Sequence, residues 1–444
     1  MNMNGLLLRS TVVAALGGLL FGFDTAVISG TTESLESVFS LNSAMLGFTV
    51  ASALIGTITG SLAVGRPGDR WGRKPVLIIL AVLYFVSALG SALAWAWVPL
   101  LLFRFIGGLA VGGASVMSPM YIAEISPARQ RGRLVAVSQF NVVLGILLAF
   151  FSNYLLAGLM QGHENTWRWM FGVEALPAAA FFVLLMGIPP SPRWLISRGR
   201  KSEARAVLER LGEPDVDERT REIVESLDIA HNHSAEGLFS RKYLFPVACA
   251  VLLAMFNQLS GINALMYYAP RIFRMAGAGE SASLLQSVAI GGTNLVFTIL
   301  AMAVIDRFGR RRLMITGSLG LILCLGLVAR AFYARDFSSG IVLFSLIGYI
   351  AFFAFSQGAV IWVFISEIFP NRVRARGQAL GSFTHWFMAA VVSWTFPVIA
   401  DYSGGHAFAL FGIMMVLQLL FVLFMMPETK GVSLEEIQKK LGIE

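Results

Sequence analysis

The sequence predicts an all-α membrane protein that crosses the bilayer twelve times, in two halves of six helices each. Of the 444 residues, 56% are apolar and only 14% are charged, and the mean hydropathy is +0.72. A water-soluble protein of this length carries more charge. The apolar runs last about 20 residues, as spanning helices require, and they do not alternate as barrel strands would. Two charged turns recur in the same order in both halves, which indicates an internal duplication.

The expected spans divide into two sets of six. In the first half, residues 1–188, they lie at roughly 9–30, 44–65, 75–97, 98–120, 133–158 and 167–188. In the second half, residues 243–427, they lie at roughly 243–270, 282–305, 312–334, 340–366, 377–400 and 405–427. The first apolar segment is too long for the core of a signal peptide, so we expect it to remain as a helix.

A polar stretch, residues 189–242, separates the halves. Opposite charges in it recur at i,i+3 and i,i+4, which predicts short amphipathic helices. We expect them to lie on the cytoplasmic side as a bridge between the halves. Residues 428–444 are expected to form a cytoplasmic tail with a short helix, which Ser433 caps with Glu436 at the capping-box spacing.

The recurring turns are rich in arginine and carboxylates. The first reads GRPGDRWGRK at 65–74 and DRFGRRR at 306–312, and the second runs from Glu124 to Arg133 and from Glu367 to Arg376. We expect carboxylate–arginine pairs between helix ends to form a latch that closes the inner face. Its residues are Asp69, Arg70, Arg73, Glu124 and Arg133, matched by Asp306, Arg307, Arg310, Glu367 and Arg376. The alternative is that these charges only anchor the turns in the cytoplasm.

The distribution of charge predicts the orientation. All but six of the 34 Lys and Arg lie at the chain ends or in every second loop, which places both termini in the cytoplasm. The net charge of +8 therefore does not indicate a nucleic-acid partner. Cys249 and Cys324 lie within apolar spans, and we interpret them as buried small residues. His231 and His233 are two residues apart, and two histidines at this spacing rarely suffice for a metal site without suitably placed carboxylates, so we expect a solvated loop there.

The motifs together resemble the sugar porter family of the major facilitator superfamily. Besides the two basic turns, they are SPRWLISRGR at 191–200, QLSGINALMYYAP at 258–270 and PETKG at 427–431. The resemblance covers essentially the whole chain and includes bacterial sugar–proton symporters and mammalian facilitative glucose transporters. It implies the major facilitator fold, with two pseudosymmetric six-helix bundles, one monosaccharide site at the midplane and alternating access between the faces.

Three ionisable residues of the first half are expected at membrane depth: Asp24, Arg104 and Glu174. Such residues need a partner, a cavity or a function. A carboxylate that alternates between an arginine and a desolvated site releases and takes up a proton, so we interpret Asp24 as a proton carrier. The resemblance implies the same, because proton symporters of the family carry this trio at the matching positions. The alternatives are a static ion pair, and a Glu174 that holds the cytoplasmic end of the sixth span.

A sugar site needs amides, which both donate and accept hydrogen bonds, and aromatic plates. Span seven supplies Asn257, Gln258 and Asn263. Gln258 and Asn263 share a face only if the helix is distorted, which Gly261 permits. The resemblance assigns sugar contact to Gln258, Asn263, Gln139, Asn294, Trp362 and Trp386, with Phe21 and Gly358 lining the cavity and Tyr267 and Tyr268 as an outer gate. The alternative for each amide is an interhelical hydrogen bond.

Two departures from the family concern the expected sugar site. The family has a glutamine where this chain has Asn257, and an amide where it has His385. A histidine there either forms a neutral hydrogen bond to a sugar hydroxyl or acts as a second proton site. These changes affect which sugar is preferred.

The sequence therefore predicts a proton-coupled symporter for a hexose or pentose. We expect it to be a monomer in a bacterial inner membrane, with no cofactor and with no set of residues for enzyme catalysis. A facilitative uniporter with the same site is one alternative, and a membrane sensor that binds a sugar without moving it is another.

Overall fold

The structure is a computed structural model that describes residues 4–127, 130–161, 163–232, 237–337, 340–370 and 372–430. Side chains are described for these residues except 228–232 and Asp306. Within this part of the chain, twelve helical segments are long and apolar enough to span a membrane, as expected. They are Gly5–Gly30, Ser43–Ala63, Arg73–Ala92, Trp97–Ile125, Arg131–Leu159, Thr166–Met186, Arg241–Met275, Glu280–Ile305, Arg310–Ala334, Ile341–Ile368, Arg374–Tyr402 and Gly404–Phe424. The expected tail helix, with Ser433 and Glu436, lies outside the described residues, as do His233 and the side chain of His231.

The chain forms two compact units. The first takes the described residues of Met1–Thr25, Ile55–Ala149 and Asn165–Ser234, and the second takes those of Ala26–Leu54, Phe150–Glu164 and Ala235–Glu444. Their bounds fall inside three helices, α1 (Gly5–Val27), α3 (Ser43–Ala63) and α7 (Arg131–Leu159). Each of these helices therefore contributes to both units. The halves defined by the repeat, 1–188 and 243–427, remain a prediction about the duplication.

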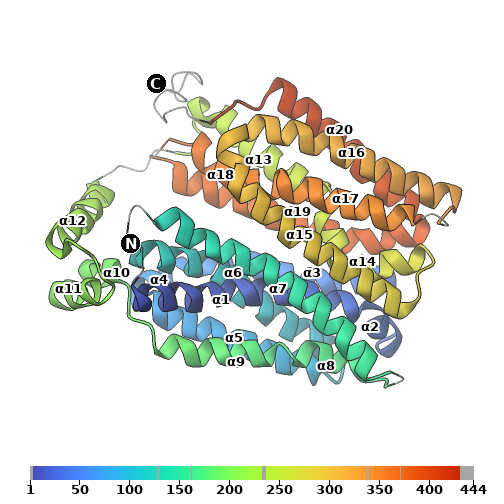
Figure 1. Ribbon diagram of the computed structural model, residues 1–444, viewed down its shortest axis with the longest axis horizontal. Helices are drawn as coiled ribbons and strands as arrows, with labels where there is room; N and C mark the ends of the chain where they lie inside the picture. Colours follow the sequence, from blue (N-terminus) through green and yellow to red (C-terminus); the bar gives the residue numbers. More distant parts are fainter. Residues whose placement is uncertain are drawn as a thin grey trace. The chain divides into compact units, whose positions relative to one another are not determined.

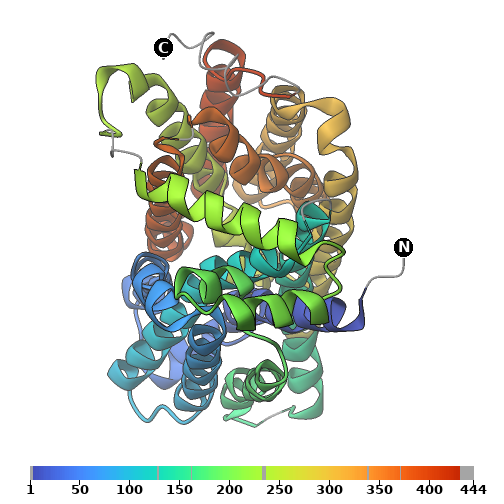
Figure 2. The ribbon, with the colours of Figure 1, turned by 90° about the vertical axis from the view of Figure 1, so that its left-hand side faces the viewer.

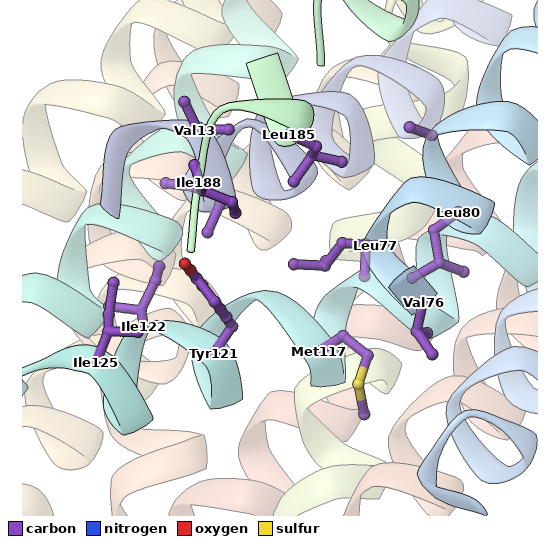
Figure 3. Close-up of a cluster of buried hydrophobic side chains, with 14 of the residues drawn as sticks. Val13, Val76, Leu77, Leu80, Met117, Tyr121, Ile122, Ile125, Leu185 and Ile188 are labelled. Atoms are coloured by element: carbon purple, nitrogen blue, oxygen red, sulfur yellow. The ribbon is translucent and has the colours of Figure 1, made fainter. Parts of the chain in front are cut away.

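The first unit contains most of the remaining spans of the first half. Besides its parts of α1, α3 and α7, its helices are α4 (Gly65–Trp71), α5 (Arg73–Ala92), α6 (Trp97–Ile125), α8 (Thr166–Gly172) and α9 (Ala175–Met186). Apolar side chains from α1, α5, α6 and α9 form its core. Figure 3 shows Tyr121 in this core, with its hydroxyl directed toward the chain beyond Ile188. The hydroxyl donates to the carbonyl oxygen of Pro189 at 2.8 Å, so a polar group is satisfied inside an apolar cluster.

The polar stretch folds into helices, as expected. They are α10 (Pro192–Ser197), α11 (Lys201–Arg210) and α12 (Val216–Asn232). Ser191 caps α10, because its hydroxyl accepts from the Trp194 backbone N–H. In Figure 1 the three helices lie at the end of the first unit where α1 begins and α4 lies, and Figure 2, which looks onto this end, shows them lying across it. We call this the turn end.

The second unit contains the spans of the second half. Besides its parts of α1, α3 and α7, its helices are η1 (Ile28–Gly30), α2 (Thr32–Val38), η2 (Arg241–Tyr243), α13 (Leu244–Leu259), α14 (Ile262–Met275), α15 (Glu280–Phe308), α16 (Arg310–Ala334), α17 (Ile341–Phe355), α18 (Gln357–Ile368), α19 (Arg374–Tyr402) and α20 (Gly404–Phe424). Two of its spans are broken, one between α13 and α14 and one between α17 and α18. Both free cysteines, Cys249 and Cys324, are buried within it, as expected.

The repeated basic turn has the same backbone conformation in both halves. Gly72, between α4 and α5, has φ +96° and ψ 163°, and Gly309, between α15 and α16, has φ +85° and ψ 159°. Residues with a Cβ rarely adopt such angles. The glycine that both copies of the motif share is therefore required by the turn. We call the end of the second unit that carries Gly309 its turn end.

Candidate functional site

The centre of the second unit is organised by the break in the seventh span. Gly261 has φ +88°, and a Cβ there would lie 2.4 Å from the ring of Phe411, so both the conformation and the space require glycine. The hydroxyl of Ser260 donates to the carbonyl oxygen of Asn257 at 2.6 Å, and Tyr349 donates to the carbonyl oxygen of Ser260 at 3.0 Å. These bonds satisfy backbone groups that the break frees from the helix.

The break brings three amides of the seventh span together. Gln258 Nε2 donates to Asn257 Oδ1 at 3.0 Å, and Asn263 Nδ2 donates to Gln258 Oε1 at 2.8 Å. The second bond joins residues five positions apart, so the expected distortion is present. Asn257 and Gln258 are almost fully buried, and the Nδ2 of Asn257 has no hydrogen-bond partner among the described residues. Such a donor is costly to leave unpaired, and it is available to a polar ligand.

His385 of α19 extends this cluster with aromatic surface. Gln258 Nε2 lies 3.2 Å from the ring nitrogens of His385. The rings of Trp362 and Trp386 each lie 4.9 Å from the imidazole, centre to centre. An amide NH₂ only donates, so a ring nitrogen accepts from it only in the tautomer in which that nitrogen carries no proton. This geometry favours the neutral, hydrogen-bonding role of His385 over a second proton site. Trp362 is 39% exposed, which leaves one indole surface open.

The structure does not bring every expected sugar residue into this cluster. Asn294 of α15 is buried in the same unit, but its Oδ1 accepts only weakly, from Thr298 at 3.5 Å, and no hydrogen bond joins it to the amides of α13 and α14 among the described residues. Gly358 lies one helical turn before Trp362 on α18. Phe21 and Gln139 belong to the first unit, where Phe21 packs partly on the core and Gln139 is exposed on α7.

The two tyrosines expected at an outer gate are both buried on α14. The hydroxyl of Tyr268 donates to the carbonyl oxygen of Ser393 on α19 at 2.9 Å. Its backbone, at φ −126° and ψ 17°, is not helical and marks a kink just before Pro270. The kink separates the two parts of α14, and the role of the tyrosines as a gate stays a prediction.

The three ionisable residues of the first unit lie together, away from water. Arg104 Nη1 donates to Asp24 Oδ1 at 2.7 Å, and its Nη2 reaches the Asp24 carbonyl oxygen at 3.3 Å. Asp24 and Glu174 are each only 2% exposed and Arg104 only 1%. Glu174 interacts electrostatically with both of the others, and its Oε1 has no hydrogen-bond partner among the described residues. The trio therefore has one uncompensated negative charge when all three groups are ionised.

Glu174 lies at a break between α8 and α9. Pro177 lacks an N–H, so the carbonyl of Val173 loses its usual helical donor, and the Leu176 N–H bonds to it instead at 3.2 Å. The whole of α9 therefore lies between Glu174 and the turn end. This position argues against the alternative in which Glu174 fixes the cytoplasmic end of the sixth span.

Sequence reasoning missed Tyr84 of α5 beside the same trio. Its hydroxyl is buried without a hydrogen-bond partner among the described residues, and it interacts with the charges of Asp24 and Glu174. A tyrosine in an apolar span was the available signal, because its polar tip needs a partner when it is buried.

Carboxylate–arginine pairs join helix ends at the turn end of each unit, and their role as a latch stays a prediction. Arg73 of α5 lies 2.8 Å from Glu124 Oε1 of α6 and also contacts Asp69 at 3.1 Å. Arg310 of α16 holds Glu367 of α18 with two bonds, at 2.8 and 3.1 Å. Each pair joins helices of its own unit. Among the remaining latch residues, the side chains of Arg70, Arg133, Arg307 and Arg376 are exposed, and that of Asp306 lies outside the described residues.

Glu428 is a further part of this network that the sequence did not reveal. Its carboxylate accepts from the backbone N–H groups of Arg310 and Arg311, at 3.0 and 3.1 Å. It thereby caps the start of α16 from a segment more than a hundred residues away. Thr429 donates to Glu367 at 2.6 Å. The PETKG motif contained these residues, but only the folded chain shows what they contact.

A second group of charges lies at the end of the second unit opposite its turn end. Arg271 of α14 donates to Glu36 of α2 at 2.7 Å and to Asp401 of α19 at 2.9 Å. Arg274 pairs with Glu33 of α2. Ion pairs thus tie the C-terminal part of α14 to two other helices.

Burial raises the pKa of Glu33 above its ordinary value, against the opposing effect of Arg274. A carboxyl whose pKa is raised in the folded arrangement stabilises it fully only below its ordinary pKa, and this contribution is lost as the pH rises through the raised value. A low pH at this end of the second unit therefore favours the arrangement in which α2 lies on α14.

Comparisons with known proteins agree with this architecture. A family model described as sugar (and other) transporter matches residues 10–441. The D-xylose-proton symporter of Escherichia coli (strain K12) is 41% identical over 96% of this chain and 94% of its own. The arabinose-proton symporter of Bacillus subtilis (strain 168) is 37% identical, over 98% and 95%. The glucose facilitated diffusion protein of Zymomonas mobilis is 35% identical, over 98% and 97%.

Solved structures show the same fold. The inward-open xylose transporter XylE from E. coli matches with a TM-score of 0.88 and 39% identity, over 98% of this chain and 99% of that one. The proton:xylose symporter XylE of the major facilitator superfamily, bound to 6-bromo-6-deoxy-D-glucose, matches with 0.81 and 39%, over 99% and 100%. With the matching family model and full-length relatives well above 30% identity, this protein has the major facilitator fold and belongs to the sugar transporter family.

Proposed function

We propose that this protein is a proton-coupled monosaccharide symporter that works by alternating access. The observation that carries the proposal is the presence, in one chain, of a buried amide–imidazole–indole cluster and a separate buried acid–arginine trio. The cluster offers donors, acceptors and aromatic faces, which suit an uncharged polyol. The trio has an excess carboxylate, which suits a proton. Relatives named as xylose–proton and arabinose–proton symporters support both halves of the proposal.

In this mechanism Asp24 carries the proton. While Arg104 holds it, the carboxylate stays ionised; when the pair loosens in the apolar surroundings, protonation removes the cost of a buried charge. Glu174 keeps the local charge negative and so favours proton uptake. The sugar binds between Gln258, Asn263, Asn257 and His385, with Trp362 and Trp386 against its ring. We infer that Gln139, Asn294, Phe21 and Gly358 complete the site and that Tyr267 and Tyr268 close it from outside.

The proposed setting is a bacterial inner membrane, with the turn ends and both termini in the cytoplasm and one chain sufficient for transport. The basic turns support this orientation, because Lys and Arg accumulate on the cytoplasmic side. The charges of α2, α14 and α19 then face the outside.

The decisive test is counterflow in proteoliposomes that contain the purified protein. A panel of aldopentoses and aldohexoses is offered with and without an imposed pH gradient. We expect one or a few of them to exchange without a gradient and to accumulate when the outside is acidic. Failure of every simple sugar to cross would rule out the proposal.

A facilitative uniporter is the second candidate, favoured by the similarity to the glucose facilitated diffusion protein of Zymomonas mobilis. The same assay separates the two. A uniporter exchanges sugar equally well but never concentrates it when a pH gradient is imposed.

The latch gives a first mutational prediction. Replacing Glu124 and Glu367 by Gln removes the carboxylates that Arg73 and Arg310 hold. Each such pair is worth at most about 1 kcal/mol, so loss of both should shift the balance toward the inward-open state by up to about 30-fold. Reactivity of a cytoplasm-facing engineered cysteine measures the shift. Glu203→Gln, an exposed carboxylate on α11, is the control. Unchanged reactivity in the double variant would leave the charges with an anchoring role only.

The outer ion pairs give a second prediction. Arg271→Gln removes the bonds of Arg271 to Glu36 of α2 and to Asp401 of α19 and leaves the Arg274–Glu33 pair in place. We expect the amide hydrogens of α2 to exchange with solvent roughly tenfold faster, because charged hydrogen bonds contribute about 1.5–3 kcal/mol before solvent screening. Arg330→Gln, an exposed arginine on α16, is the control and should leave exchange unchanged. Equal exchange in both variants contradicts a role of Arg271 in holding this end closed.

A further inference from the structure

The first unit contains a cavity of about 410 Å³ at its turn end. It lies where the end of α6 and the start of α7 meet α10 and α12, and its charged lining residues are Glu124, Arg131, Arg193, Arg219 and Glu222. Cavities of about 300–1,000 Å³ hold small-molecule ligands. None of its arginines belongs to the proposed sugar site, the proton trio or the latch.

The carboxylates of the cavity are already engaged. Glu124 is held by Arg73 and also accepts from the hydroxyl of Ser191. Glu222 pairs with Arg219 at 2.8 Å. Their charges are therefore compensated by neighbours within the first unit, and they add little repulsion for an anion.

Two arginines of the cavity lack such a partner. Arg193 donates to the neutral hydroxyl of Ser226 at 3.0 Å. Arg131 makes no ion pair among the described residues, and its Nε is buried without a hydrogen-bond partner. Arg193 and Arg219 both act electrostatically on Arg131, with Glu222 acting in the opposite sense, and all three arginines line the same cavity. Like charges gathered in this way repel, and a bound anion relieves the repulsion.

The start of α7 adds to the positive potential. Arg131 is the first residue of this 29-residue helix, and its first turn contains no acidic residue. The first backbone N–H groups of a helix have no partner inside the helix, and the helix dipole is positive there.

We propose that this cavity binds the phosphate group of a small phosphorylated ligand. The two uncompensated arginines match the charge of about −1.5 to −2 that a phosphate monoester carries at pH 7. Guanidinium groups bind phosphate oxygens in pairs, while Met120 and Ile223 offer apolar lining to the rest of the ligand. A bound phosphate joins the start of α7 to α10 and α12 through Arg131 and Arg193.

The test uses the full-length protein purified in detergent, titrated calorimetrically with glycerol phosphate at constant ionic strength. We expect saturable binding, weakened at least about tenfold by Arg193→Gln and more by Arg131→Gln with Arg193→Gln. Arg221→Gln is the matched control, because Arg221 lies on α12, pairs with Glu218 and is exposed. It should bind as the parent does. Thermal unfolding without ligand verifies that each variant is folded, and the single variant suffices if the double one is not.

The phosphate can come from a soluble ester or from a lipid headgroup. Binding of glycerol phosphate indicates the soluble source. A rise in Tm in nanodiscs with phosphatidylglycerol over phosphatidylcholine alone, lost in the double variant, indicates the headgroup. The proposal is overturned if neither effect is seen up to ~10 mM ligand, a very weak affinity, or if the arginine variants respond as the parent does. Sugar transport is not the readout, so this outcome is independent of the proposed function.

Discussion

Asp24→Asn is expected to abolish the accumulation of sugar against its gradient while sugar exchange continues. Asparagine has nearly the same shape as aspartate but cannot take up or release a proton in this pH range. Asp24 forms the only ion pair of Arg104 among the described residues, so its loss uncouples the protonation step from the movement of the helices. With an inward pH gradient, the ratio of internal to external sugar should fall to that of passive equilibration, as in a uniporter.

The exchange measurement distinguishes this result from simple misfolding. A variant that exchanges labelled for unlabelled sugar at a rate near that of the parent has an intact sugar site. Asp217→Asn is the matched control, because Asp217 is an exposed carboxylate on α12 paired with Arg205. It should accumulate sugar normally. Survival of uphill uptake in Asp24→Asn would show that another group, Glu174 first among them, carries the proton.

Gln258→Ala is expected to weaken sugar binding by about 10- to 100-fold. Gln258 donates to Asn257, accepts from Asn263 and faces His385, so its removal leaves several buried polar groups without partners. An unsatisfied buried group costs about 1–3 kcal/mol, and the donors that should meet the sugar lose their orientation. Half-saturation of counterflow with the preferred aldose measures the change.

Gln418→Ala provides a stringent control for this second prediction. Gln418 is also a buried amide of the second unit, and its Nε2 donates to Ser318 on α16 at 2.9 Å. Replacing Gln418 by Ala also leaves a buried polar group without its partner and so lowers the stability of the fold. Gln418 itself lies outside the amide cluster. An equal loss of sugar affinity in both variants would mean that Gln258 supports the fold and does not contact the sugar.

Features that depend on local chemistry could be predicted from the sequence. The number of spans follows from apolar length, because a helix must cross the hydrocarbon with its backbone bonds satisfied. The break at Gly261 could be predicted because Gln258 and Asn263, five residues apart, can share a face only if the helix is distorted. Carboxylate–arginine pairing at the helix ends follows from the repeated pattern of charges, although the individual pairs, Arg73–Glu124 and Arg310–Glu367, are seen only in the folded chain.

Features that depend on how helices pack could not be predicted in this way. The indole of Trp362 lies beside His385 because α18 and α19 approach each other, and no spacing in the chain reveals that approach. Glu428 caps α16 only because the chain after α20 folds back onto it. The division into two units differs from the sequence repeat for the same reason: a repeat records the origin of the chain, whereas packing places one end of each of α1, α3 and α7 with the second unit.

The two thiols of this chain have a practical consequence. Cys249 and Cys324 are both enclosed by packed side chains, and water-soluble maleimides react with thiolates that solvent can reach. The natural protein should therefore give almost no background with such reagents. Fluorophores or spin labels can then be attached at chosen positions without first rebuilding the native sequence.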